Sequence, residues 1–221
     1  MPRPKGTRDA DYEDKRRELL RKMTVRMMRR EVARPSLREL AQSADVSVPT
    51  LRHYFGARRG VVDAMLAECL RLGREGLDAQ STSEKSFDLS MRDYARTLIQ
   101  ALNAQREVRL GDIFAVSLAE GLVDAEISAS TLSHILEPTI ETLEARLLVH
   151  IARQEMIEAD TRAAALMLLS PLLLASLHQD QLHGAAHRPM ALEAVADDLS
   201  AAFVRAYRAT PSTTCEQSAP A

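Results

Sequence analysis

Ser36 to Arg59, SLRELAQSADVSVPTLRHYFGARR, is the stretch that decides the fold of this chain. It opens with Ser36 and Glu39, which have the S-x-x-E spacing of a capping box and can satisfy two backbone amides at a helix start. Apolar residues follow at helical spacing and predict a short helix with one buried face: Leu37, Leu40, Ala41 and Ala44. Because the two alanines are small, a second helix can cross this one closely.

The second half of the stretch predicts a tight turn and another helix. Asp45 stands at the turn, and aspartate tolerates the left-handed conformation better than most residues other than glycine. Ser47 is a suitable N-cap, and a proline two residues later is compatible with a first helical turn. The inner face consists of Val46, Leu51 and Phe55, and the outward and flanking positions are Val48, Pro49, Thr50, Arg52, His53 and Tyr54. This order makes a helix-turn-helix, whose second helix docks in the major groove of DNA.

These residues resemble the helix-turn-helix of TetR-family bacterial transcriptional regulators, whose pattern is close to I-A-x-x-A-G-V-S-x-x-T-L-Y-x-H-F-x-x-K-x-x-L. The matching residues are Leu40, Ala41, Ala44, Val46, Ser47, Thr50, Leu51, Phe55, Arg58 and Val61. Two positions depart from the pattern, since Asp45 replaces the turn glycine and Arg52 replaces a tyrosine. The family's tyrosine role therefore does not transfer to Arg52.

The resemblance implies an all-α fold of about nine helices, with an N-terminal three-helix DNA-binding head and a C-terminal body that binds an effector and dimerises. Outside the quoted stretch, helical spacing predicts helices at about 12–31, 59–77, 87–105, 111–120, 138–154, 160–182 and 190–208. We expect a DNA-binding domain with a basic arm over 1–58, an effector-binding and dimerisation domain over 59–209, and a disordered tail over 210–221.

The charge of the chain is divided in the same way. Residues 1–60 contain 16 Lys/Arg and 8 Asp/Glu, a balance of +8, and residues 61–221 contain 13 and 23, a balance of −10. A basic surface binds DNA phosphates through counterion release. A charge cluster alone is more often a solvated face, but its coincidence with a helix-turn-helix favours a DNA-binding head.

Specific DNA contacts can be predicted on this basis. Arg52 can hydrogen-bond a guanine edge or contact a phosphate, and the sequence leaves both open. The family resemblance implies that Val48 and Pro49 lie near bases and that Thr50 and Tyr54 lie near phosphates. Arg58 opens the next helix and is expected to bind a phosphate. The other predicted DNA-binding residues are Ser36, Ser47 and His53, together with Arg3 and Lys5 in the N-terminal arm. This arm either follows the DNA or is only a solvated tail.

The two C-terminal helical segments are expected to form a homodimer interface. Residues 163–177 are apolar over most of a helical circumference, so this helix must be buried on more than one side. Packing within its own chain is the alternative. The candidate interface residues are Leu173, Leu177, Leu192, Val195, Leu199 and Phe203. The family resemblance also implies a dimer, and a two-fold protein presents two recognition helices about one DNA turn apart.

The resemblance further implies that a small molecule enters the body, shifts the helix at 59–77 and releases the DNA operator. Candidate lining residues are Leu98, Leu102, Phe114, Leu118, Leu143, Leu147, His150 and Met167, for each of which an ordinary core position is the alternative. The aliphatic composition favours a hydrophobic effector. Family habit favours a repressor over an activator.

Other classes of protein and site are disfavoured. Cys69 and Cys215 lack metal or redox spacing, which suits a reducing cytoplasm. The N-terminus lacks the apolar core of a signal peptide, and the apolar run 163–177 is shorter than a bilayer span. No metal or cofactor is expected, because the histidines at 178, 183 and 187 do not share one helical face and no glycine-rich phosphate loop occurs. The alternatives to a regulator are an architectural DNA-binding protein without an effector and, less favoured, an all-α enzyme.

Overall fold

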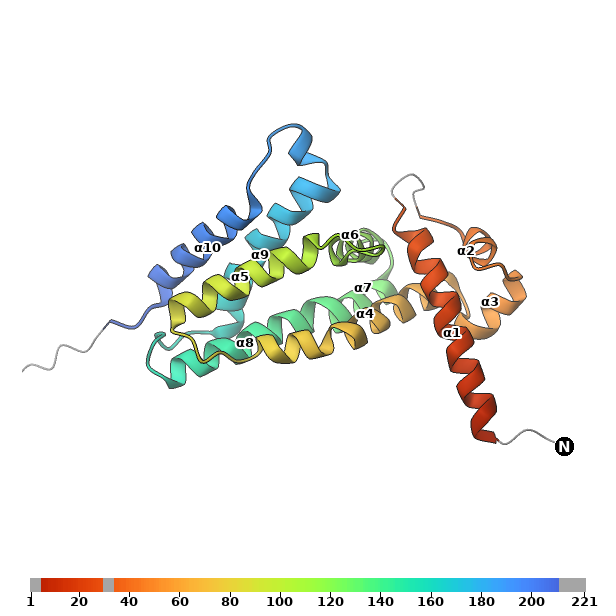
Figure 1. Ribbon diagram of the computed structural model, residues 1–221, viewed down its shortest axis with the longest axis horizontal. Coiled ribbons are helices and arrows are strands. Elements are labelled where there is room, and N and C mark those ends of the chain that lie inside the picture. The colour runs from red at the N-terminus through yellow and green to blue at the C-terminus, as the bar shows by residue number, and fades with distance from the viewer. Residues whose placement is uncertain (1–4, 30–33, 211–221) are drawn as a thin grey trace, which may run out of the picture.

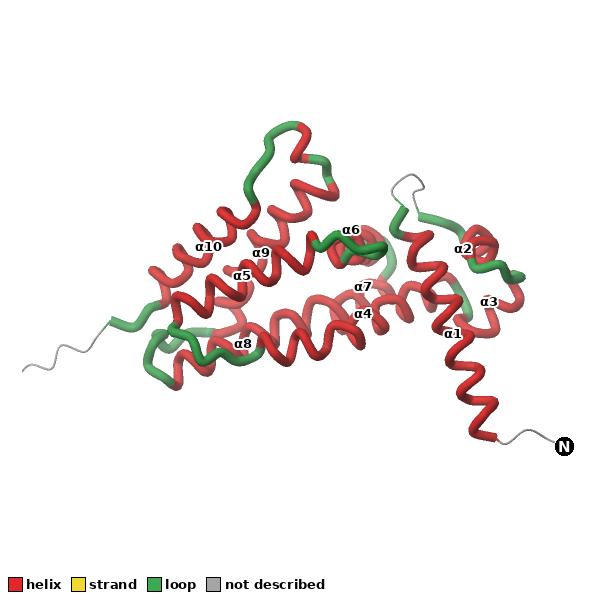
Figure 2. Tube along the Cα trace, in the orientation of Figure 1, coloured by secondary structure: helices red, strands yellow, loops and turns green. Residues whose placement is uncertain are grey.

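In the computed structural model, residues 5–29 and 34–210 are described, with side chains from residue 11 onward, and the regular elements among them are all helices (Figure 1, Figure 2). The predicted all-α fold is thus confirmed. Arg3, Cys215 and nearly all of the predicted tail lie outside the described residues, and Lys5 is described only as the first residue of a helix.

The head consists of α1 (Lys5–Met27), α2 (Leu37–Ser43) and α3 (Val48–Phe55), seen in red and orange in Figure 1. Its interior is apolar, and its most deeply buried side chains include Leu19, Met23, Leu40 and Leu51. The helix α1 begins earlier than the expected residue 12, so the predicted arm is partly helical. Ion pairs at helical spacing stabilise its exposed face, where Glu18 bonds both Lys15 and Lys22.

The helix α4 (Arg58–Gln80) runs from the head along the length of the body (Figure 1). Its first turns complete the apolar core of the head through Val61, Val62, Met65 and Leu66. Beyond residue 80 the chain leaves the helix at the break that the sequence predicts, and it then forms α5 (Phe87–Asn103) and α6 (Leu110–Gly121).

The next helix differs from the prediction, because it starts at Ala125 instead of near Pro138. It comprises α7 (Ala125–Thr131), the π-helical turn η1 (Leu132–Leu136) and α8 (Glu137–Ala152), which follow one another without a break. A proline lacks an amide and its ring crowds the preceding turn, and the wider π-helical turn lies immediately before Pro138. With these three segments counted as one helix, the described residues contain the expected nine helices.

The last helices close the body. The helix α9 (Thr161–Ser176) continues as the π-helical turn η2 (Leu177–Gln181), and after the short 3-10 turn η3 (Gly184–Ala186) the chain forms α10 (Leu192–Tyr207). The helix α10 packs against α5 and α9 (Figure 1). A second apolar core lies among α5, α8, α9 and α10, and its fully buried members include Met91, Leu143, Leu147, Leu168 and Leu172.

The continuous helix 161–181 is longer than the apolar run 163–177 that the sequence analysis judged too short for a bilayer. By length and composition alone, Thr161–Gln181 could cross a membrane, and it is the one helix of the described residues that passes this test. A core helix of a water-soluble protein passes the same test. Because Ala165, Leu168 and Leu172 are buried against neighbouring helices, we assign it to the core.

Candidate nucleic-acid interface

The first helix of the helix-turn-helix starts at the predicted capping box. The Ser36 hydroxyl accepts a hydrogen bond from the Glu39 amide at 3.3 Å, and the Ser36 amide donates to Glu39 Oε2 at 2.7 Å. The bond from the Ser36 amide lowers the pKa of the Glu39 carboxyl, because it favours the charged form. Both serines on the predicted DNA surface, Ser36 and Ser47, therefore serve as N-caps, and the Ser47 hydroxyl accepts from the Thr50 amide at 3.2 Å.

The turn between the two helices has the left-handed residue that the sequence predicts. Asp45 has φ 58°, and its amide donates to the Gln42 carbonyl at 3.1 Å. The next amide, from Val46, donates to the Ala41 carbonyl at 3.0 Å. This pair of bonds is the Schellman motif, in which glycine is the usual left-handed residue. Aspartate takes that position here, so the turn geometry of the helix-turn-helix is kept.

The outward face of α3 is open to a ligand as large as DNA. Pro49, Arg52 and His53 are exposed, whereas Val48, Thr50 and Tyr54 are half-buried and flank them. The guanidinium of Arg52 bonds none of the side chains or backbone groups in the described ranges. A free guanidinium on this face can reach either a base edge or a phosphate.

An aromatic cluster on α3 was not predicted from the sequence. The ring of Tyr12 from α1 stacks on Tyr54, with centroids 4.7 Å apart, and meets the edge of His53 at 5.8 Å. Tyr54, which was predicted near a phosphate, therefore also fixes α1 against α3. The signal in the sequence is weak, because Tyr12 and Tyr54 are 42 residues apart and only the fold brings them together.

Arg58 is paired within the protein in this structure, and its predicted contact with a phosphate stays a prediction. Its two terminal nitrogens bond both carboxylate oxygens of Glu120 on α6, and its Nε donates to the Pro35 carbonyl at 2.7 Å. The guanidinium is largely buried. The family pattern predicted a basic residue at this position but contained no information on its partner in the body.

Solved structures resemble this arrangement over nearly the whole chain. A protein from Mesorhizobium loti assigned to the TetR family of transcriptional regulators superposes with a TM-score of 0.72 at 17% identity, over 89% of this chain and 98% of that one. A TetR transcription regulator from Haloarcula marismortui gives 0.69 at 13% identity, over 89% and 99%. SmeT, the repressor of the Stenotrophomonas maltophilia multidrug efflux pump SmeDEF, gives 0.63 at 18%, over 89% and 91%. No protein-family model and no curated protein matches the sequence.

The chain has the TetR-family fold. At these identities the likeness concerns the fold, and the residues at each site have to be judged by their own geometry. Within the TetR fold, the predicted DNA-binding residues that lie on one continuous surface are those of α3 and its N-cap.

None of the predicted effector residues lines either of two open concavities of the described residues. Leu102, Phe114, Leu143 and Leu147 are buried in packed helices, Leu98 and Leu118 are half-buried, and Met167 is 58% exposed on the outer face of α9. The two concavities lie elsewhere, one between α1 and α2 and one between the end of α1 and α6. The location of an effector site within the TetR fold stays a prediction, and Met167 does not face the interior as expected.

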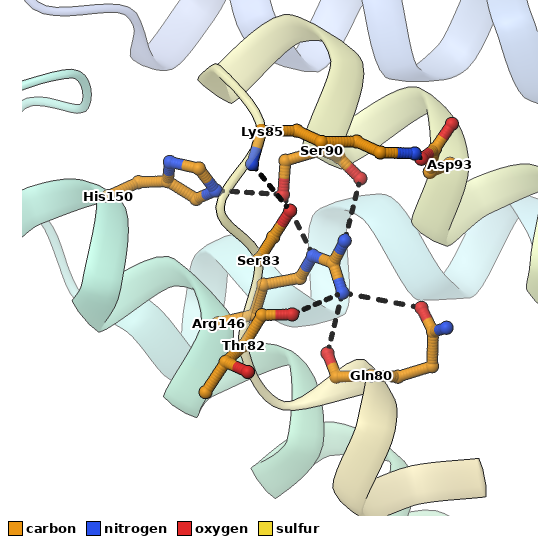
Figure 3. Close-up of polar contacts among 8 residues, drawn as sticks. All are labelled: Gln80, Thr82, Ser83, Lys85, Ser90, Asp93, Arg146 and His150. Atoms are coloured by element: carbon orange, nitrogen blue, oxygen red, sulfur yellow. Dashed lines mark hydrogen bonds and ion pairs between the residues drawn. The ribbon is translucent and has the colours of Figure 1, made fainter.

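His150, another predicted effector residue, belongs to a buried polar network at the far end of α4 (Figure 3). Its Nε2 lies 2.8 Å from the Ser90 hydroxyl, and its Nδ1 lies 2.6 Å from Glu155. Ser90 also accepts from Arg146 Nε at 2.8 Å. The same guanidinium donates to the carbonyl of Gln80 at 2.8 Å and that of Thr82 at 3.1 Å.

Serine, histidine and a carboxylate in this order are the groups of a nucleophilic triad. Ser90 and His150 are both completely buried, and the serine hydroxyl is already bonded to Arg146. A substrate carbonyl therefore has no approach to Ser90, and the network joins α4, α5 and α8 instead. Among the described residues, no group of three or more His, Cys, Asp or Glu side chains is placed to hold a metal ion.

The predicted dimer residues point only partly outward. Phe203 is 5% exposed and packs between Phe87 and Tyr207, so its assignment to an interface is wrong. Leu173, Leu192 and Leu199 pack partly against the core of their own chain, and Leu177 and Val195 are half-buried. The apolar residues that do face outward on α9 are Leu166, Met167 and Leu174. Leu166 lies seven residues before Leu173 and therefore on the same face of α9. The interface itself stays a prediction.

Proposed function

We propose that this protein is a ligand-responsive transcriptional regulator that binds a palindromic DNA operator as a homodimer. The observation that carries the proposal is the outward face of α3, where Arg52 is exposed beside Pro49 and His53 and bonds no other described residue. The TetR-family fold supports it, because the solved relatives are transcriptional regulators. The basic balance of residues 1–60 supplies attraction to phosphates.

A dimer would use the outer faces of α9 and α10. Leu166, Met167 and Leu174 expose an apolar strip on α9, and small residues at 194, 202 and 206 on α10 allow close approach of a second copy. An exposed apolar strip of this kind is a usual mark of an interface. Two-fold pairing would set two α3 helices about one DNA turn apart, which fits a palindrome.

Release by a small hydrophobic molecule, repression instead of activation, and a cytoplasmic location follow from the resemblance to TetR-family regulators. SmeT shares the fold and is a repressor of an efflux pump. A ligand acts on DNA binding only if its affinity differs between the DNA-bound and free arrangements of the heads. A thermal-shift screen with hydrophobic compounds, followed by DNA release assays on the hits, tests this part.

Selection from a pool of randomised DNA duplexes tests the central part. We expect the wild-type protein to enrich a short palindrome, and sedimentation to give two chains per duplex. Enrichment of no sequence, with uniform coverage of DNA, would instead support an architectural protein. No binding at low salt would contradict a DNA-binding function altogether.

A further inference from the structure

The start of α4 is fastened to the body through a buried ion pair. Arg58 forms a bidentate pair with Glu120 near the end of α6, and the side chains of both residues are largely buried. A third bond from the same guanidinium to the Pro35 carbonyl, at 2.7 Å, connects the pair to the segment before α2. One arginine thus links the head, α4 and α6.

Acidic residues of the α6–α7 corner also hold the neighbouring arginine. Arg59 lies 2.7 Å from Glu126 on α7, and both side chains are exposed. Arg34 approaches Glu120 as well, with 3.7 Å between its Nε and Oε2. The basic start of α4 and the acidic corner are therefore complementary in charge, but only the pair with Glu120 is buried.

A carboxylate and a phosphate present the same kind of target to arginine, namely two oxygens that accept parallel hydrogen bonds from the guanidinium. Arg58 opens α4, three residues after the last residue of the recognition helix α3. The two N–H groups that form the bidentate pair with Glu120 cannot form a bidentate pair with a phosphate at the same time, and the Nε–H is bonded to the Pro35 carbonyl.

We propose that Glu120 competes with DNA phosphate for Arg58, and that this competition lowers the DNA affinity of the free protein. This inference rests on the proposed function, because it concerns the regulation of the same DNA surface. The exchange leaves Glu120 buried without its partner, which is costly unless another cation replaces it. Arg34 is placed to do so.

The competition gives the body a direct means to control the head. A movement of α6 that tightens the Arg58–Glu120 pair lowers DNA affinity, and DNA that binds Arg58 loosens the contact between α4 and α6. Coupling between two sites is reciprocal, so both effects have the same size. Glu120 is in this sense a positioning residue and not a DNA ligand.

The variant Glu120→Gln tests the competition, because it keeps the side-chain shape and removes the charge. On the palindromic duplex selected by the wild-type protein, we expect binding tighter by roughly 5- to 100-fold, the usual range of coupling between two sites. The slope of log K against log salt should steepen by about 0.9, the value for one added phosphate contact. Glu126→Gln is the matched control, and its exposed pair should change affinity by no more than about fivefold.

Two further variants keep the test decisive if Glu120→Gln folds poorly, as urea unfolding would reveal. Arg58→Lys loses the bidentate pair but keeps a charge for phosphate, so it should bind DNA more tightly than the wild type. Arg58→Gln should weaken binding strongly in the Glu120→Gln background and little in the wild type. A merely structural ion pair would instead give weaker or unchanged binding and an unchanged salt slope in all of them.

The outcomes separate the two proposals. If the wild-type protein selects no duplex and binds no DNA at low salt, the proposed function fails and the competition with it. If the wild type selects a palindrome but neither Glu120→Gln nor Arg58→Lys binds more tightly, only the competition is overturned.

Discussion

The two ends of α4 are each fastened by an arginine, but the partners differ. At the N-terminal end, Arg58 bonds the carboxylate of Glu120. At the C-terminal end, Arg146 from α8 bonds the carbonyls of Gln80 and Thr82 and the hydroxyl of Ser90, all of which are neutral (Figure 3). Burial lowers the pKa of Arg146, since its bonded partners do not offset the loss of water with a negative charge.

Because its partner is an anion, the contact of Arg58 with Glu120 can be replaced by a contact with another anion, whereas the hydrogen bonds of Arg146 to neutral groups cannot. In the proposed competition a DNA phosphate would replace the carboxylate of Glu120, because both are anions with two suitable oxygens. No group of DNA could reach the buried acceptors around Arg146, which hold the last turn of α4 to the body. The helix is therefore anchored at its far end and can respond at the end next to the head.

The largest expected effect comes from breaking the anchored end. Arg146→Met leaves the carbonyls of Gln80 and Thr82 and the Ser90 hydroxyl without their donor in a buried site. We expect the free energy of unfolding to fall by about 2–4 kcal/mol, since each unsatisfied buried group costs about 1–3 kcal/mol. Urea unfolding measures this loss.

The control for that variant is Arg153→Met, which removes an exposed hydrogen bond to the Ser83 carbonyl at the same end of the body. It should cost less than about 1 kcal/mol. Equal losses for the two variants would show that the buried network does not anchor α4.

The variant Arg52→Ala compares Arg52 on α3, which bonds no other described residue, with Arg58 on α4, which is paired with Glu120. Because Arg52 bonds nothing within the described part of the chain, its removal should leave the free energy of unfolding unchanged. If Arg52 contacts a base, discrimination at one base pair falls by about 1–3 kcal/mol. If it contacts a phosphate, all sequences bind more weakly and the salt slope flattens. DNA affinities equal to those of the wild type for every sequence would contradict both roles.

Ser36→Ala should have a smaller effect, confined to the head. It removes the hydroxyl that accepts from the Glu39 amide, so the free energy of unfolding should drop by about 1 kcal/mol. Aspartate is an equally good N-cap, and Ser36→Asp should restore the loss. The capping account fails if alanine and aspartate behave alike in urea unfolding.

Asp45→Gly should have the smallest effect. It restores the glycine of the family pattern at φ 58°, which relieves left-handed strain but adds entropy to the unfolded chain. These terms nearly cancel, and we expect a change within about 1 kcal/mol in either direction. A larger loss would indicate that the Asp45 side chain makes a contact beyond the turn itself.

The sequence predicted those features that depend on local spacing. The capping box at Ser36, the left-handed Asp45, the N-cap at Ser47 and the break between the helices predicted at 59–77 and 87–105 are all confirmed. Each of these is decided by residues within one or two helical turns, where the preferences of the backbone are strong.

The features that the sequence did not predict depend on pairs that are distant in the chain. Glu120 lies 62 residues from Arg58, and Ser90 lies 56 residues from Arg146. At these separations, neither the Arg58–Glu120 ion pair nor the Arg146–Ser90 hydrogen bond can be predicted from helical spacing. The outward face of α9 depends on distant packing as well. A helix that is apolar on all sides does not show which side meets its own core, and the packing of α5 and α10 decides it.

Hydroxyl-radical footprinting of the wild-type protein on its selected duplex tests the central claim most directly. We expect protection of a short palindrome at two patches about one helical turn apart, as two copies of α3 in successive major grooves would give. Uniform protection along the duplex, or a single unpaired patch, would contradict a dimeric regulator that recognises its operator through α3.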